Sequence, residues 1–319
     1  MIYIRKILIL GGLGLLISCS SNPYRTTNKI YKKKAKAYAK ELSRFPLEEN
    51  PNDSALNYGE YAVGTTNFNL RRPNFVVIHH TAQDSTIQTL NTFTIPRTQV
   101  SSHYVIGDDG AVFHMLNNYY RAWHGGVGQW GHTTDLNSAS IGIELDNNGK
   151  EAFSEAQISS LLDVLKQLKE DYKIPAANFV GHLDIAPGRK TDPSADFPWK
   201  RLAEEGYGIW YDAERIENIQ FEHKFFTENP LKIDNINPVF KQRIPLLDRY
   251  LFPDVIPSDF TIAEALRIIG YNIDDLDAAI KSFQIHFLQE KDHVNGILNA
   301  EGIKILYDLY QKSLLEARS

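Results

Sequence analysis

Apolar residues have a strand-like spacing in several short runs of the chain. Residues 75–79 form a near-continuous run of β-branched and aromatic side chains, which is typical of a buried central strand. Residues 140–145 alternate with period two and predict another strand. The runs at 102–106 and 111–115 flank a Gly-Asp-Asp-Gly turn, so they predict a β-hairpin.

Helical spacing is clearest between Ser154 and Lys173. Ser154 and Gln157 have the spacing of a capping box. The apolar stripe that follows comprises Ile158, Leu161, Leu162, Leu165 and Leu168. A short helix is expected over residues 86–93. Together these elements indicate a mixed α/β domain, with a central mostly β sheet flanked by helices, which we place at residues 71–212.

The C-terminal part of the chain is again helical in pattern. Residues 259–269, 276–288 and 299–315 predict three short helices, so residues 258–319 are expected to form a small helical domain. Residues 213–257 contain many charged, aromatic and proline residues, and we expect them to connect the two domains.

The first residues have the pattern of a secretory signal. A short basic start and an apolar run lead to small residues and Cys19. The run is too short to cross a membrane, which takes about 20 apolar residues. Leu16 to Cys19 resembles a bacterial lipobox, which implies removal of residues 1–18 and attachment of lipid to Cys19. The alternative is an ordinary signal peptide with an incidental cysteine.

Residues 19–70 would then form a lipid-anchored N-terminal segment. Within it, residues 29–44 predict a strongly basic helix, which is either solvated or attracted to anionic headgroups beside the anchor. The net charge of the 319 residues is −5, and nucleic-acid-binding proteins instead carry a basic surplus. Cys19 is the only cysteine of the sequence, which excludes an internal disulfide.

Candidate chemistry lies in the main domain. The segment from Val180 to Pro193 packs a histidine, two aspartates, an arginine and a lysine around glycine and proline, which is typical of a rigid loop at a binding site. Seven of the ten histidines lie between His79 and His182, so most of them need a structural explanation. His79 and His80 are adjacent on one predicted strand and point to opposite faces, and this alternation alone does not choose between them.

Five short motifs occur in order along this domain. They are Val77-Ile78-His79-His80-Thr81-Ala82, Ser102-His103-Tyr104, Ala122-Trp123-His124-Gly125-Gly126, the strand from Ser140 to Leu145, and the loop from Val180 to Pro193. Together they resemble the N-acetylmuramoyl-L-alanine amidase family, including its AmiD-like outer-membrane lipoprotein members, and are related to the peptidoglycan recognition proteins. Each motif alone is weak, but five in the right order are specific.

The resemblance implies a zinc enzyme. It implies that His79, His182 and Asp192 bind Zn²⁺, with Asp192 at a position where recognition proteins commonly have cysteine. Two imidazoles and one carboxylate leave a fourth position for water, as in catalytic zinc sites.

The resemblance also places Glu144 and Lys190 at the site. We assign Glu144 as the general base that later protonates the leaving amine, and Lys190 as the group that stabilises the oxyanion. Gly142 shares the strand face of Glu144, which leaves room there for a substrate.

Several other residues of the motifs have two interpretations. Trp123 and His124 could line the substrate groove, or Trp123 could belong to the core. Asp184 either orients a ligand histidine or caps its loop. His80 is expected to support the site rather than to bind the metal.

The resemblance therefore implies an amidase that cleaves the bond between N-acetylmuramic acid and L-alanine of peptidoglycan stem peptides, in cell-wall turnover or recycling. The alternative is a recognition protein that binds peptidoglycan without cutting it. The Phe283-Gln284 pair, followed by Asn295-Gly296, resembles peptidoglycan-binding helical modules, although these often have aspartate at the position of Asn295. The alternative is a helical appendage that only supports the catalytic domain. We expect a monomeric outer-membrane lipoprotein that faces the periplasm, with muropeptides as partners.

Overall fold

The computed structural model describes residues 22–43, 65–67, 69–222 and 254–316. The chain divides into two compact units, residues 1–69 and residues 70–319. The first contains helix α1 (Arg25–Leu42), in which no residue is buried. The basic helix expected over residues 29–44 is therefore present, but it begins four residues earlier, at Arg25, and ends at Leu42. Among the described residues, no helix has the length and apolar content that a membrane crossing requires.

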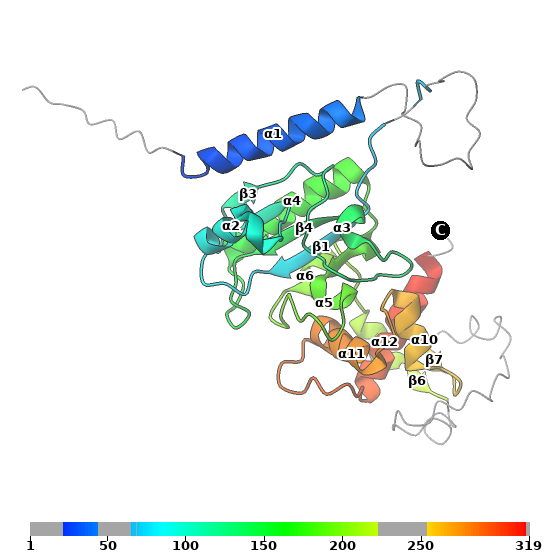
Figure 1. Cartoon of the computed structure of the whole chain (residues 1–319). Helices are drawn as coiled ribbons and strands as arrows, with labels where there is room; N and C mark the ends of the chain where they lie inside the picture. The colour runs from blue at the N-terminus through cyan, green and yellow to red at the C-terminus, as the bar shows by residue number, and fades with distance from the viewer. Residues whose placement is uncertain (1–21, 44–64, 68, 223–253, 317–319) are drawn as a thin grey trace, which may run out of the picture. The chain divides into compact units, whose positions relative to one another are not determined.

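A five-stranded sheet forms the centre of the second unit (Figure 1). Its order is β3-β2-β4-β1-β5, and only β3 runs antiparallel to its neighbour. The strands are β1 (Phe75–His80), β2 (Tyr104–Ile106), β3 (Val112–His114), β4 (Ser140–Leu145) and β5 (Phe179–Gly181). The expected strands and the hairpin are confirmed. The sequence did not predict β5, because three residues are too few to display a period.

One face of the sheet packs against α4 (Glu155–Tyr172), which matches the expected helix. Val76, Ile78 and Ile141 of the sheet pack there against the apolar stripe of α4. The Ser154 hydroxyl accepts a hydrogen bond from the Gln157 backbone N–H, so the helix cap is confirmed. The reciprocal half of the capping box is wrong: the Gln157 amide instead donates to the carbonyls at the ends of β2 and β4.

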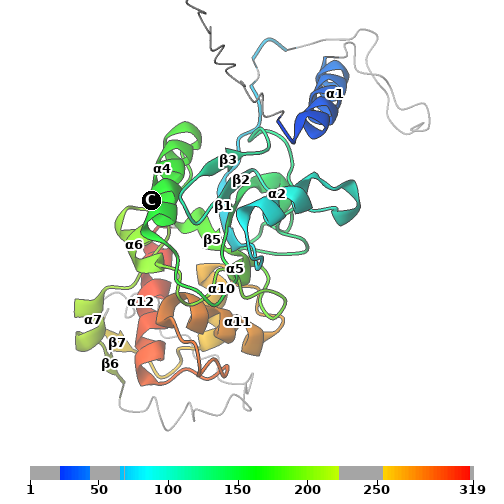
Figure 2. The same ribbon diagram turned by 90° about the vertical axis from the view of Figure 1, so that its left-hand side faces the viewer.

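The opposite face is covered partly by the C-terminal helices (Figure 2). These are α10 (Ile262–Ile269), α11 (Leu276–Phe283), the π-helical segment η3 (Gln284–Leu288) and α12 (Ala300–Glu316). The three helices expected in this region are therefore present. Their buried side chains form one hydrophobic cluster with Phe75, Val77 and Val180 of the sheet.

Short elements complete the unit. They are α2 (Thr86–Thr94), η1 (Pro96–Thr98), α3 (Leu136–Ala139), η2 (Ala176–Asn178), α5 (His182–Ile185), α6 (Trp199–Glu204), α7 (Ala213–Asn218), β6 (Gln220–Phe221) and β7 (Val255–Ile256). Strands β6 and β7 form a small parallel pair at the two ends of the expected connecting segment. This pairing was not predicted from the sequence.

The motif that resembles a peptidoglycan-binding module has a structural explanation. Phe283 is fully buried in the hydrophobic cluster. The amide of Gln284 is also buried, and it binds the turn at Asn295: its nitrogen donates to Asn295 Oδ1 and the Ile297 carbonyl, and its oxygen accepts from the Gly296 N–H. The two halves of the motif therefore hold each other in place.

Candidate metal centre

Three potential metal ligands converge where parallel strands of the sheet end. His79 is near the carboxyl end of β1, and His182 is the first residue of α5, directly after β5. Asp192 comes from the loop that follows α5, and its carbonyl accepts a hydrogen bond from the Leu183 N–H. Because β1 and β5 are parallel neighbours, their carboxyl ends meet at one edge of the sheet, where such folds commonly bind ligands.

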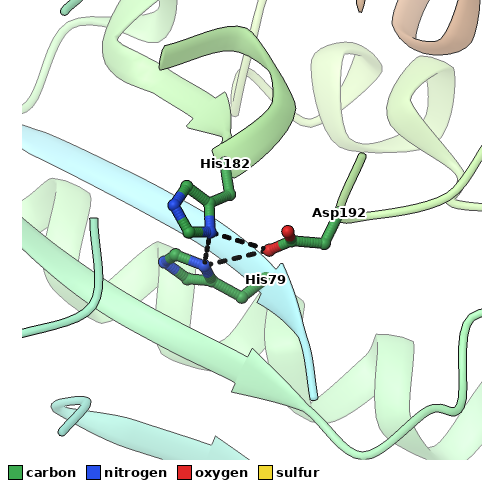
Figure 3. Close-up of side chains that lie close together, drawn as sticks. All are labelled: His79, His182 and Asp192. Atoms are coloured by element: carbon green, nitrogen blue, oxygen red, sulfur yellow. Dashed lines mark hydrogen bonds and ion pairs between the residues drawn. The ribbon is translucent and has the colours of Figure 1, made fainter. Parts of the chain in front are cut away.

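The donor atoms of these side chains form a small, buried triangle (Figure 3). Nδ1 of His79 lies 2.9 Å from Nδ1 of His182 and 3.1 Å from Oδ2 of Asp192. The third side, between His182 Nδ1 and Asp192 Oδ2, is 3.0 Å. Zinc with bonds of about 2.0 Å in a tetrahedron separates its ligand atoms by about 3.3 Å, so the triangle fits such an ion after a small expansion.

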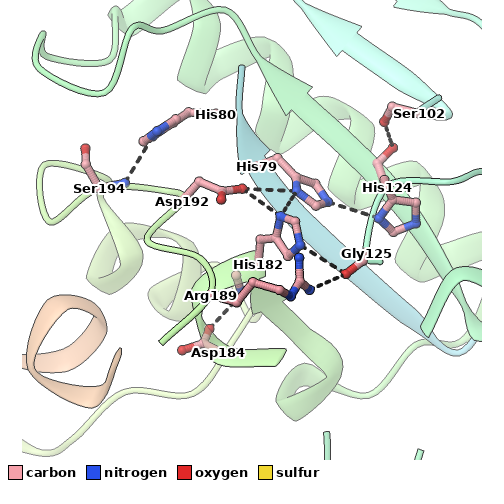
Figure 4. A network of polar contacts seen from close by, with 12 residues as sticks. His79, His80, Ser102, His124, Gly125, His182, Asp184, Arg189, Asp192 and Ser194 are labelled. Atoms are coloured by element: carbon pink, nitrogen blue, oxygen red, sulfur yellow. Dashed lines mark hydrogen bonds and ion pairs between the residues drawn. The ribbon is translucent and has the colours of Figure 1, made fainter. Parts of the chain in front are cut away.

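The hydrogen bonds of His182 define which of its nitrogens is free. Its Nε2 faces the Gly125 carbonyl at 3.1 Å (Figure 4). A carbonyl only accepts, so Nε2 carries the proton and donates it. In the neutral ring, Nδ1 then presents a lone pair to the triangle. The Arg189 guanidinium donates to the same carbonyl and holds it in place.

A chain of hydrogen bonds fixes His79 in the same way. The Ser140 hydroxyl donates to the Leu136 carbonyl and therefore accepts from Nε2 of His124, at 3.1 Å. Burial lowers the pKa of His124 well below its usual value, so that ring is neutral and its Nδ1 accepts. The acceptor lies 3.0 Å from His79 Nε2, which must donate (Figure 4).

The donor set therefore suits a cation. Burial, and then the neighbouring His182, lower the pKa of His79 to about 4, so at neutral pH its Nδ1 is a lone pair. Two lone pairs and a carboxylate oxygen within about 3 Å of one another repel in the absence of a positive charge. Two imidazoles and a carboxylate are also the ligand set of catalytic zinc sites.

Glu144 faces the triangle from the neighbouring strand. It is the register partner of His79 in the parallel pair β1–β4, so both side chains point to the same face. Burial, and then the charge of Asp192, raise the pKa of Glu144 to about 8, whereas the charge of Lys190 lowers it. Both Glu144 and Lys190 are partly exposed, so a substrate can reach them.

The chain was compared with known proteins. A family model described as N-acetylmuramoyl-L-alanine amidase matches residues 69–195. The N-acetylmuramoyl-L-alanine amidase AmiD of Escherichia coli is 34% identical over 255 residues, which cover 74% of this chain and 82% of that protein. The chain belongs to the N-acetylmuramoyl-L-alanine amidase family.

Solved amidase structures share its fold. AmiD from Escherichia coli, in complex with the substrate anhydro-N-acetylmuramic acid-L-Ala-D-gamma-Glu-L-Lys, has a TM-score of 0.58 at 29% identity, covering 79% of this chain and 93% of that one. AMPDH3 from Pseudomonas aeruginosa, in complex with anhydromuramic pentapeptide, has a TM-score of 0.59 at 28% identity, covering 81% and 98%. The mixed α/β architecture expected from the sequence is thus an amidase fold.

His80 and Asp184 lie beside the candidate metal ligands of this amidase without joining the triangle. His80 points to the other side of β1, where its Nδ1 accepts from the Ser194 N–H, two residues after Asp192. Asp184 accepts from the Gly181 N–H and makes no hydrogen bond to His182. Of its two interpretations, the structure shows the cap.

Trp123 and His124 have different surroundings in the amidase. Trp123 is 50% exposed and therefore does not belong to the core. His124 is buried behind His79, and its ring fills the space above Gly142. The prediction that this space is left for the substrate was therefore wrong. The roles of Ser140, the Gly125 carbonyl and Arg189 were not predicted, because a serine, a carbonyl and a loop arginine have no distinctive sequence pattern.

Proposed function

We propose that this amidase hydrolyses the amide bond between N-acetylmuramic acid and L-alanine of peptidoglycan stem peptides, with Zn²⁺ held by His79, His182 and Asp192, in cell-wall turnover or recycling. The main observation behind this proposal is that the side chains of these three buried residues converge beside Glu144 at one edge of the sheet. The ligands named for the AmiD and AMPDH3 structures, both anhydromuramic peptides, support this choice of bond.

The positions of the side chains support the following roles. Zinc, when bound, lowers the pKa of water and polarises a carbonyl group. The Glu144 carboxylate takes the proton of the attacking water and returns it to the nitrogen of the leaving L-alanine. The Lys190 ammonium stabilises the negative charge that develops on the carbonyl oxygen. Trp123 offers an exposed aromatic face for the sugar or peptide.

The first test is removal of the metal and of the base. A chelator should abolish the release of stem peptides from purified peptidoglycan, measured by mass spectrometry, and added Zn²⁺ should restore it. Glu144→Ala should lower kcat by about 10²–10⁴-fold, as expected for loss of a general base. Unchanged release after chelation, or full activity of Glu144→Ala, would contradict the proposal. Binding of muropeptides without zinc or cleavage would instead indicate a recognition protein.

We also propose that the chain is a monomeric lipoprotein of the outer membrane, anchored at Cys19 and facing the periplasm. Cys19 lies outside the described residues, so the proposal is supported by the lipobox resemblance and by the exposed basic helix α1. Labelled palmitate should enter the wild-type protein in bacterial cells and should not enter Cys19→Ala. Equal labelling of both proteins, or none of the wild type, would refute the anchor.

A further inference from the structure

The carboxylate of Asp184 is buried next to the metal centre and accepts hydrogen bonds from separate segments of the chain. Asp184 lies two residues after His182 and is 0% exposed. Its oxygens accept hydrogen bonds from the Gly181 N–H at 2.7 Å, from the Tyr271 hydroxyl at 2.7 Å and from His286 Nδ1 at 2.8 Å. The first donor is the last residue of β5, directly before α5, whereas the other two come from the C-terminal helical region.

The same region also binds the backbone of α5. The Ser282 hydroxyl of α11 donates to the Leu183 carbonyl at 2.9 Å. The N–H of Leu183 donates to the carbonyl of Asp192 at 2.8 Å. Helix α5 is a single turn of four residues that begins at His182. Its position therefore determines where one ligand side chain and the backbone of another lie.

Both side-chain donors are themselves held rigidly. The His286 ring is stacked between Trp199, with centroids 4.0 Å apart, and Phe287, at 4.1 Å. Its Nε2 is buried and has no hydrogen-bond partner in the part of the chain that the structure describes, so Asp184 is the polar partner of this ring. Tyr271 is buried with its ring edge-on to Trp130, at 4.9 Å. Neither donor can follow Asp184 if α5 moves.

From this geometry we infer that Tyr271 and His286 are positioning residues of the metal centre: they hold Asp184, and through it the single turn that presents His182. The inference rests on the proposed zinc site. The C-terminal helical region is, on this view, part of the support of the metal centre as well as a neighbouring module. Groups that orient metal ligands through hydrogen bonds typically change metal affinity by about 10–100-fold when they are removed.

The test measures metal affinity and uses a matched control. Tyr271→Phe removes one hydroxyl from Asp184, and His286→Phe keeps a stacked ring without the donor. Tyr307→Phe is the control: its hydroxyl donates to the Val255 carbonyl in the same helical region, away from α5. Each full-length protein is stripped of metal, checked for its fold by near-UV circular dichroism, and titrated with Zn²⁺ against a chromophoric chelator.

We expect Tyr271→Phe and His286→Phe to raise the zinc Kd by about 10–100-fold, and Tyr307→Phe to leave it within about twofold. The visible spectrum of the Co²⁺-loaded protein should change in the first two variants only, because it reports ligand geometry. Tight zinc binding by the wild type with an equal Kd in Tyr271→Phe and Tyr307→Phe would overturn this inference alone. A wild type without zinc affinity would overturn the proposed function as well.

Discussion

At the scale of residues, the adjacent histidines His79 and His80 lie in different surroundings. Strand alternation predicts that the two side chains point to opposite faces, and they do: one joins the triangle and the other binds the Ser194 N–H. Alternation does not say which face holds the site. That depends on the register with β4, which pairs His79 with Glu144, and registers between distant segments are not encoded in local spacing.

Glu144 makes the stability of the metal-free protein depend on pH. Its pKa is raised from 4.5 to about 8 in the folded chain, so between these values the folded state keeps a proton that the unfolded state has lost. The free energy of unfolding should therefore fall as the pH rises through this window. The Glu144→Gln variant has no ionisable group at this position. Urea unfolding at several pH values should show a flatter profile for the variant than for the wild type.

His79 does not obscure this comparison. Its pKa is lowered to about 4, so it destabilises the fold as the pH falls below the usual histidine value, which is the opposite direction. The contribution of His79 is present in both proteins and cancels in their difference. Parallel pH profiles for wild type and Glu144→Gln would show that Glu144 has an ordinary pKa in the folded chain.

At the scale of elements, the sequence predicted the longer strands and helices but not how their side chains share space. Strand β4 was identified from its alternation, and Gly142 was noted as the small residue on the face of Glu144. The ring above that glycine comes from His124, which lies in an irregular segment between β3 and α3. A loop without periodicity gives no signal of where its side chains go, so the neighbour of Gly142 could not be predicted.

Gly142→Ala tests this packing. A Cβ at this position would lie 2.5 Å from Cγ of His124, whose ring is held between His79 and Ser140 and cannot retreat. We expect the substitution to lower the free energy of unfolding by about 1–3 kcal/mol, as is typical of overpacking, and to weaken zinc binding. Both effects are measured on the full-length protein, by urea unfolding and by zinc titration.

A double-mutant cycle separates packing from other causes. In a His124→Ala background the ring is absent, so adding Gly142→Ala should cost less stability than it does in the wild type. The same cost in both backgrounds would mean that the His124 ring is not the obstacle.

At the scale of the whole molecule, the sequence suggested a catalytic domain, a connecting segment and a helical domain, and these boundaries stay predictions. The composition of each stretch supports the division, and the helices occur where expected. The structure adds that the C-terminal helices share a hydrophobic cluster with β1 and β5. Contacts between segments separated by some two hundred residues leave no trace in local patterns, so a shared core can be found only in three dimensions.

The hydrogen bonds of Asp184 also bear on the order in which the enzyme is made. Chains are synthesised from the N-terminus, so all three donors, His79, His182 and Asp192, exist before Tyr271 and His286. If the last two support the metal centre, a prematurely terminated chain carries every ligand and still holds metal poorly. Activity against the cell wall would then require that translation has passed His286, and shorter copies would be inactive.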